Sequence, residues 1–171
     1  MQMVKKGLII FLSVIVALVV FAPKKSLYYL LESELQKNGV VLSDENISEN
    51  PIGVTISNAK VYVENTYIGD IQEISLLTLL FYNDVTLTNF IPTQSIKRML
   101  PISVDSAKIN YAIWDPLKVS IFIQGSMGIA QGEIDITEQK IILRFNKDAN
   151  IAPIRGYLKK DQNGWYYEQN L

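Results

Sequence analysis

The feature that most constrains this chain is an uncharged apolar run near its N-terminus, from Gly7 to Ala22. Together with Met3, Val4 and Pro23, the run approaches the roughly 20 residues that a membrane-spanning helix needs. A helix satisfies its backbone hydrogen bonds internally, as a bilayer demands of any segment that crosses it. The sequence therefore predicts a transmembrane signal-anchor within residues 1–25.

A cleaved signal peptide is the alternative interpretation of this run. The best small-residue cleavage site is Val20-Phe21-Ala22, but Pro23 would directly follow the cut and is expected to block it. An uncleaved anchor is therefore predicted. Two lysines stand on each side of the run, so the lysines alone do not decide the orientation. The short N-terminal tail favours an N-terminus inside and an exported domain.

The chain contains no cysteine and no histidine. Their absence excludes disulfides, thiolate metal sites and a cysteine nucleophile, and it removes the commonest general base. From Ser26 onward, twelve basic and seventeen acidic residues leave a net charge of −5. Nucleic-acid binding requires neutralised phosphates, so an acidic domain without a basic stripe predicts no nucleic-acid partner.

A membrane-proximal amphipathic helix is predicted over residues 26–39. Ser26 is a suitable N-cap and Gly39 a natural stop. Leucines at helical spacing form one apolar side: Leu27, Leu30, Leu31 and Leu35. Tyr28 and Tyr29 lie where an interfacial aromatic belt is expected. The helix either lies on the membrane surface or packs its leucines on a sheet, and packing on a sheet is favoured.

Residues 40–171 are predicted to form a mainly β domain, a curled antiparallel meander sheet. Past Gly39 the apolar period changes to two, with a phase slip at Ser57-Asn58 that indicates a bulge or turn. Apolar residues alternate most clearly in four later segments, which contain Ala107 to Ile113, Val119 to Ile123, Ile134 to Ile136 and Ile141 to Phe145. Because only one face is apolar, a single sheet that bends around that face is favoured over a sandwich.

Turn residues separate these segments, and three other segments of the domain carry their own signals. The turns are expected at Trp114-Asp115-Pro116, Gly125–Gly128 and Thr137–Gln139. Near the C-terminus, Asn163-Gly164 predicts a two-residue hairpin loop between residues 156–162 and 165–169. The apolar run at 76–82 fits both a short helix and a buried strand. Residues 94–100 predict a helical turn ended by Pro101.

The sequence predicts no catalysis, no metal site and no cofactor. Asp44, Glu45 and Glu49 lack the acidic spacing of a calcium loop and are expected to be solvated. Glu133 and Asp135 face away from the apolar side of their strand, as solvent-facing acids do. Three glycines lack the Gly-Lys-Ser/Thr of a phosphate loop and indicate turns or bulges: Gly125, Gly128 and Gly132. The aromatic run Trp165-Tyr166-Tyr167 is expected to pack across strands.

Several motifs resemble the type II secretion system protein N family. Its members tend to carry a signal-anchor, a Leu-Tyr-x-Leu-Leu helix, a Val-x-Leu-Ser-x-Glu step and a Pro-x-Gly-Val/Leu element. The matching residues here are Leu27-Tyr28-Tyr29-Leu30-Leu31, Val40-Val41-Leu42-Ser43-Asp44-Glu45 and Pro51-Ile52-Gly53-Val54. The segment from Gln124 to Asp135 is also similar to a Gly-rich hairpin of that family and of the wider AsmA-like group. The resemblance extends from residue 7 to about 146, and this chain is shorter than the family's pattern.

The resemblance implies a single-pass protein of the bacterial inner membrane, with its C-terminal domain in the periplasm. It implies a component of a type II secretion system or of a related competence or pilus machine. The partners expected from it are inner-membrane lipid and other secretion-system membrane proteins. AsmA-like relatives imply instead a groove that handles lipid.

Two hypotheses of function follow. The first is a non-enzymatic subunit that acts in assembly or protein interaction within a secretion apparatus. The second is a lipid-handling protein whose apolar β face forms an open groove for a lipid ligand. The residues whose packing separates the two are Ile109, Tyr111, Ile113, Val119, Ile121 and Ile123. The sequence does not decide whether they form a filled core or an open groove.

Overall fold

The structure, a computed structural model, describes residues 10, 13, 24–79 and 81–171 of the chain. The predicted anchor, residues 1–25, lies outside the described residues except for Ile10, Ser13, Lys24 and Lys25. Within the described part of the chain, no helix combines the length and the apolar character needed to cross a bilayer.

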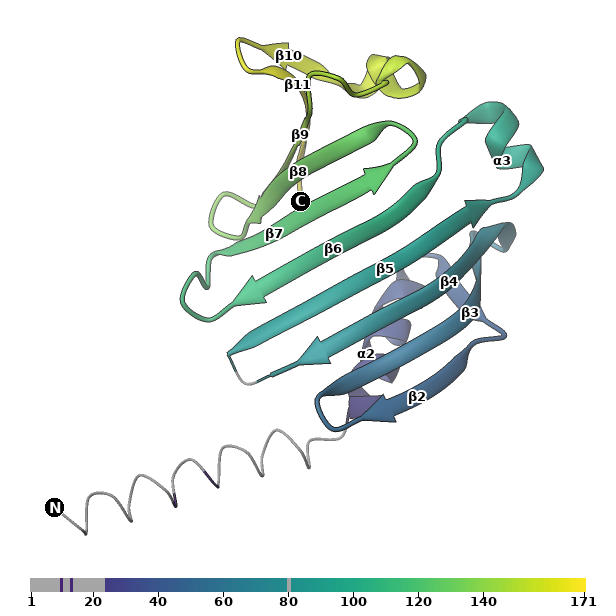
Figure 1. The fold of residues 1–171 in the computed structure, drawn as a ribbon, viewed down its shortest axis with the longest axis vertical. Coiled ribbons are helices and arrows are strands. Elements are labelled where there is room, and N and C mark those ends of the chain that lie inside the picture. The colour runs from purple at the N-terminus through teal and green to yellow at the C-terminus, as the bar shows by residue number, and fades with distance from the viewer. Residues whose placement is uncertain (1–9, 11–12, 14–23, 80) are drawn as a thin grey trace, which may run out of the picture.

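The described residues form one large antiparallel sheet that is not closed (Figure 1). Strands β3 to β9 follow one another as a meander; β11 and β10 extend one edge, while β1 and β2 both pair with β3 at the other. The mainly β antiparallel meander predicted from the sequence is confirmed. The strands are β1 Val40–Ser43, β2 Asn46–Asn50, β3 Gly53–Val63, β4 Thr66–Thr78, β5 Tyr82–Pro92, β6 Val104–Ala112, β7 Lys118–Gly125, β8 Gly128–Asp135, β9 Lys140–Phe145, β10 Lys159–Asp161 and β11 Gly164–Asn170.

Within the described ranges 24–79 and 81–171, three helical segments accompany the sheet: α2 Lys24–Lys37, α3 Gln94–Met99 and the 3-10 helix η1 Ala152–Tyr157. The helix predicted at 26–39 is confirmed, and Gly39 ends it with a φ of +76°, which glycine adopts at no steric cost. The predicted cap is wrong, because α2 already includes Lys24 and Ser26 lies inside it. The helical turn before Pro101 is also confirmed, and Thr93 caps it by accepting a hydrogen bond from Ile96 N–H.

Helix α2 packs on one face of the sheet, which we call the inner face; the opposite face is the outer face. Tyr28, Leu31 and Leu35 of α2 join a hydrophobic core with the inner-face residues of β1, β3 and β4. In Figure 1, α2 lies behind this part of the sheet, so the viewer looks at the outer face. The favoured interpretation, a helix that packs on a sheet, is therefore confirmed, although Leu30 remains 60% exposed.

Tyr28 is the most completely buried residue of α2. Its side chain is 0% exposed, and its hydroxyl donates to Glu45 Oε1 at 2.8 Å. Burial, together with the hydrogen bond to Glu45, raises the pKa of the Tyr28 hydroxyl well above its usual range. The burial of this ring agrees with the favoured packing of the helix on the sheet and excludes the alternative in which Tyr28 lies in an interfacial aromatic belt. Its neighbour Tyr29 is 54% exposed.

A row of irregular positions crosses the first strands of the sheet. Asn58 in β3 and Asn89 in β5 both have positive φ values, 58° and 56°. The cross-strand pairs that flank each asparagine place Gln72 of β4 opposite both of them. Asn89 Nδ2 donates to Gln72 Oε1 at 3.0 Å. The phase slip predicted at Ser57-Asn58 is thus confirmed, and it continues into the neighbouring strands.

This row, which we call the irregular row, keeps apolar residues on the inner face both before and after it along each strand. In β3 the buried residues Ile56 and Ala59 are three apart, and in β4 Ile71 and Ile74 are also three apart. Strict alternation would turn one half of each strand outward, because a shift of one residue exchanges the two faces. The irregular row therefore lets long strands bury apolar residues at both ends.

Two further predictions are corrected. Residues 76–82 are neither one helix nor one strand: β4 ends at Thr78 and β5 begins at Tyr82, with the turn between them. At the C-terminus, Asp161 pairs with Gly164, so the loop residues are Gln162-Asn163 and the hairpin is shifted by one residue from the prediction. Its first strand is also short, because the preceding residues form η1.

Replacing Tyr28 by alanine tests the core between α2 and the sheet. We expect Tyr28→Ala to lower the free energy of unfolding by about 3–5 kcal/mol, because it leaves a cavity and removes the hydroxyl that donates a hydrogen bond to Glu45. Chemical denaturation of the full chain measures this change. Tyr29→Ala is the matched control and should cost about 0.5 kcal/mol or less. Equal losses for both variants would contradict the packing described here.

Replacing Asn58 by valine tests the irregular row. A β-branched residue is strained at a positive φ, so we expect Asn58→Val to lower the free energy of unfolding by about 1–2 kcal/mol. Asn58→Gly should be tolerated, because glycine reaches this conformation freely. Thr55→Val in the regular part of β3 is the control. A larger loss from glycine than from valine would show that φ at this position is not limiting.

Candidate functional site

The apolar residues predicted on β6 and β7 lie on the inner face of the sheet. The cross-strand pairs are Ala107–Ile123, Ile109–Ile121 and Tyr111–Val119. Directly paired residues point to the same side of a sheet. Val85 of β5, which packs against the core beneath α2, pairs with Ile109. The predicted face is therefore a continuation of the face that α2 covers, and Ile113 follows it just past the end of β6.

The two halves of the inner face differ sharply in burial. Under α2, Val54 and Ile56 are 2% and 1% exposed, whereas Ile109 of β6 is 41% exposed. The other predicted residues are half-buried, apart from Ile113, which is exposed. Among the hydrophobic residues described on β6 to β9, Ala130 alone is fully buried. The structure thus brings the six predicted residues together on an open face instead of in a filled core.

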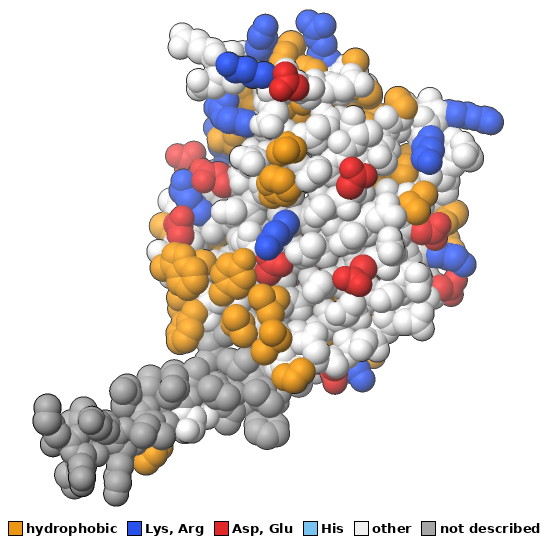
Figure 2. All heavy atoms as spheres, in the orientation of Figure 1, with side chains coloured by type: hydrophobic (Ala, Val, Ile, Leu, Met, Phe, Trp, Pro, Cys, Tyr) orange, Lys and Arg blue, Asp and Glu red, His pale blue; other side chains and the backbone are white. Residues whose placement is uncertain are grey.

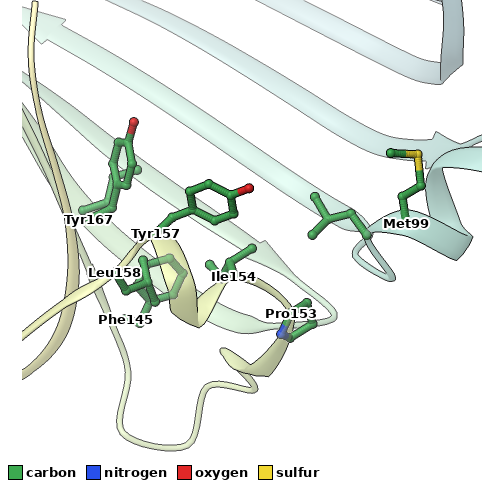
Figure 3. A pocket seen from close by; sticks show the side chains of 9 residues that line it. Met99, Phe145, Pro153, Ile154, Tyr157, Leu158 and Tyr167 are labelled. Atoms are coloured by element: carbon green, nitrogen blue, oxygen red, sulfur yellow. The ribbon is translucent and has the colours of Figure 1, made fainter.

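The open face leads to a cavity of about 530 Å³ at the end of the sheet where α3 and η1 lie. Figure 3 shows side chains of η1, among them Ile154 and Tyr157, on one side of this space and Met99 of α3 on the other. The lining is Met99, Leu100, Leu143, Phe145, Pro153, Ile154, Tyr157, Leu158 and Tyr167. It contains no charged side chain, so the cavity suits an apolar occupant.

A second cavity of about 190 Å³ adjoins the first. Leu143 and Phe145 of β9 line both cavities. Ile123, one of the predicted residues, lines the second together with Ala130. The predicted face therefore meets the two cavities at Ile123. We call this apolar surface, which is hollowed at the two cavities, the groove.

The outer face is polar. On this face Asp84, the third residue of β5, is buried; it accepts hydrogen bonds from Thr86 Oγ1 at 2.8 Å and from Asn110, and Lys108 Nζ lies 3.2 Å away. Figure 2 shows mostly uncoloured polar atoms with scattered charges over much of this face. A polar outer face leaves the inner face as the apolar surface available to a ligand.

Ion pairs hold the C-terminal strands that form one side of the groove. Arg144 Nη1 lies 2.8 Å from Asp161 Oδ2 and lowers the pKa of that carboxyl. Burial raises the pKa of Glu168, but hydrogen bonds from Lys140 and Lys159, at 3.3 and 3.4 Å, outweigh it and lower the pKa. These pairs join β9, β10 and β11.

The aromatic run at the C-terminus packs as a strand, as predicted. Arg144 lies over the ring of Tyr166 on the neighbouring strand at 5.1 Å. Arg155 of η1 and Lys160 lie over Trp165, at 4.9 and 5.4 Å from its centroid. These cation–π contacts fix η1 to the hairpin, and so position one wall of the larger cavity.

The acidic residues considered from the sequence are paired within the chain. Asp44 lies 2.6 Å from Lys60, which lowers the pKa of that carboxyl; Glu49 lies 3.9 Å from Lys25. Glu133 lies 2.9 Å from Lys118. Among the described residues, no three Asp, Glu, His or Cys side chains are grouped so as to hold a metal ion. Asp44, Glu49 and Glu133 therefore act as partners of nearby lysines, whereas Glu45 accepts from the Tyr28 hydroxyl.

Sequence reasoning missed the wall that η1 and α3 build at the end of the groove. The prediction assigned Gly156 to the start of a strand, yet Ile154, Tyr157 and Leu158 have the spacing of one helical face. That spacing is the signal that would have indicated a helix here. No signal in the sequence indicated that α3, over 50 residues earlier, lies opposite it.

No family model, curated protein or solved structure matches this chain. The resemblance to the type II secretion system protein N family therefore rests on the quoted motifs.

Lowering the pH tests the ion pairs of the C-terminal hairpin. The pKa of Asp161 in the folded chain lies below its ordinary value of 3.8, so this pair stabilises the hairpin above that pH. Its contribution is lost as the pH falls through the folded pKa. We expect amide exchange in β10 and β11, corrected for intrinsic rates, to rise below about pH 4. Asp161→Asn should flatten this dependence, and an unchanged profile in that variant would contradict it.

Proposed function

We propose that this chain is a membrane-anchored, non-enzymatic protein that binds the acyl chain of a lipid in the groove. The observation that carries the proposal is the open inner face of β6 to β9, which continues into an uncharged cavity of about 530 Å³. A contiguous apolar surface left open on a folded domain is typical of a binding site. The curled shape predicted for the sheet belongs to this proposal, because bending would place the groove walls around a ligand.

The dimensions of the groove suit an extended hydrocarbon chain. Strands rise about 3.4 Å per residue, so the inner-face residues from Ile141 to Phe145 span about 14 Å. The last two of them, Leu143 and Phe145, already line the larger cavity. Binding a chain along this path would remove apolar surface from water, at about 25 cal/mol per Å². The cavity volume also lies within the usual range for small-molecule sites.

Basic residues near the cavity favour a lipid with an anionic head group. Lys97 and Arg98 lie in the last turn of α3, and Arg155 lies in the last turn of η1. Both helices contribute side chains to the cavity wall. In Figure 2, Lys and Arg side chains gather toward the top of the view, where Figure 1 places β10 and η1. A negative head group at the cavity mouth would meet favourable potential there.

The membrane location rests on the apolar run from Gly7 to Ala22. We propose an inner-membrane protein with its N-terminus inside and residues 26–171 in the periplasm. Lipid would then be available next to the groove. The role as an assembly subunit of a type II secretion system, which is the first hypothesis from the sequence, would use the same open face to bind a protein, and it is the second candidate function.

Mass spectrometry of the full chain, purified gently from its membrane, tests the lipid proposal. We expect one co-purified lipid per chain, released by Ile121→Glu, which places a charge in the middle of the groove. Ser120→Glu is the matched control, because Ser120 is the exposed neighbour on the outer face and should retain the lipid. Leu143→Trp, which fills the junction of the two cavities, should also reduce retention without adding charge.

Three results would overturn the lipid proposal. One is the absence of lipid from the wild-type chain, and another is equal retention by Ile121→Glu and Ser120→Glu. The third is the recovery, after crosslinking through Ile121, of a secretion-machine protein in place of lipid, which would favour the assembly role. Circular dichroism of each variant separates loss of lipid from loss of fold.

A further inference from the structure

One end of the sheet carries a line of exposed apolar side chains on successive turns. The turns are those between β2 and β3, β4 and β5, β6 and β7, and β8 and β9. These side chains are between 47% and 71% exposed, and we call them the rim: Ile52, Phe81, Ile113, Trp114, Leu117 and Ile136. Figure 2 shows hydrophobic side chains gathered at the lower left, where Figure 1 places the turns after β4 and β6.

Hydrogen bonds hold neighbouring turns of the rim side by side. Thr78 N–H donates to the carbonyl oxygen of Ile52 at 2.9 Å, and Ile113 N–H donates to that of Phe81 at 3.0 Å. Ile136 N–H donates to that of Leu117 at 2.9 Å. The ring of Trp114 also stacks on Tyr82, with centroids 6.3 Å apart. The rim is therefore a continuous, supported edge, unlike scattered apolar residues on mobile loops.

Helix α2 begins at this same end of the sheet. Lys25 N–H donates to Glu49 Oε1 at 3.0 Å, and Glu49 directly precedes the turn that contains Ile52. From there α2 runs to Lys37 and the chain enters β1 at the opposite end, where Val40 pairs with Val63. The apolar run ends at Ala22, two residues before α2. Two residues span at most about 7 Å, so the sequence leaves only a short connection between the run and the start of α2.

We propose that the rim inserts into the surface of the lipid bilayer that holds the apolar run, so that the groove opens directly onto lipid. This inference rests on the proposed membrane anchor. With so short a connection, an anchored domain has the rim end nearest the bilayer. Trp, Phe, Leu and Ile exposed together are the residue types that enter the apolar boundary of a membrane.

The groove meets the rim without a polar break on β7, β8 and β9. At this end of the three strands the inner-face residues are Val119, Ile134 and Ile141, which pair directly across the strands. Ile113 belongs both to the rim and to the residues that extend the groove. An acyl chain whose head group lies at the cavity mouth beside η1 would therefore run along apolar side chains to these turns, where it would meet the bilayer.

Charge does not drive this docking. The charged residues in the turns that carry the rim are Asp115 and Glu138, both acidic and exposed. They would be repelled by an anionic surface, so the attraction comes from apolar area. Docking should therefore occur on zwitterionic phosphatidylcholine and should not weaken as salt is raised.

Tryptophan fluorescence tests the rim, because the two tryptophans lie at opposite ends of the sheet. The full chain is reconstituted into phosphatidylcholine vesicles, with or without bromine on the acyl chains. With Trp165→Phe, the remaining Trp114 should lose most of its emission in brominated vesicles. Its emission maximum in unbrominated vesicles should lie at a shorter wavelength than that of the same variant unfolded in denaturant without lipid or detergent. With Trp114→Phe, the remaining Trp165 should lose little of its emission in brominated vesicles. Both results should be the same at low and at high salt.

Rim and control variants extend the test to the other side chains. Phe81→Ser with Leu117→Ser should reduce the quenching of Trp114 several-fold. Ile91→Ser is the control: Ile91 is 48% exposed and lies at the end of β5 away from the rim, so quenching should be unchanged.

Vesicle flotation separates failure of the rim from failure of the anchor. If the chain floats with vesicles but Trp114 is not quenched, the anchor holds and the rim proposal is wrong. If the chain does not float, both are wrong. If Trp114 is protected in a dimer seen by crosslinking, and bromine has no effect, the rim joins two copies and the bilayer proposal is overturned. Lipid retention in the groove is measured by mass spectrometry, independently of these three outcomes, so the rim proposal can fail without the lipid proposal.

Discussion

The packing of one helix on part of a much wider sheet is the constraint on which the rest of this structure depends. An α-helix is about 10–12 Å wide and neighbouring strands are about 4.8 Å apart, so α2 shields only two or three strands. Tyr28 completes that shielded region, with its ring buried and its hydroxyl satisfied by Glu45. The strands beyond β5 continue the same apolar face without a helix over it, because the chain supplies no second long helix among its described residues.

The sheet therefore has a sealed half beneath α2 and an open half beyond β5. The sealed half carries the irregular row, whose positive φ values at Asn58 and Asn89 keep apolar residues inward along long strands. The open half has regular β7 and β8, a groove between its strands and η1, and ion pairs that stabilise its outer edge. Stability is concentrated where α2 packs, and apolar surface is left free where a ligand is proposed to bind.

Particular residues show how far sequence reasoning reaches. Alternation correctly predicted the strands around Ile109 and Ile121, and the slip at Ser57-Asn58 was visible because apolar residues changed phase. Leucine spacing correctly predicted α2, yet it did not separate buried Tyr28 from exposed Tyr29, since adjacent residues on a helix differ only in the direction they face. The 76–82 run was ambiguous because a turn between two apolar strand ends has no period of its own. The cavity wall was missed because α3 and η1 are distant in the sequence.

By itself, the sequence determined the local structure: an apolar run of near-membrane length, a helix that ends at Gly39, and a succession of strands with one apolar face. These follow from residue periodicity and turn chemistry, which act over a few residues. Tertiary structure alone decided which part of that apolar face is buried, because coverage depends on where α2 lies against the sheet. It also brought four turns together as the rim at the end where α2 begins, since only strand pairing places residues as distant as Ile52 and Ile136 on one edge.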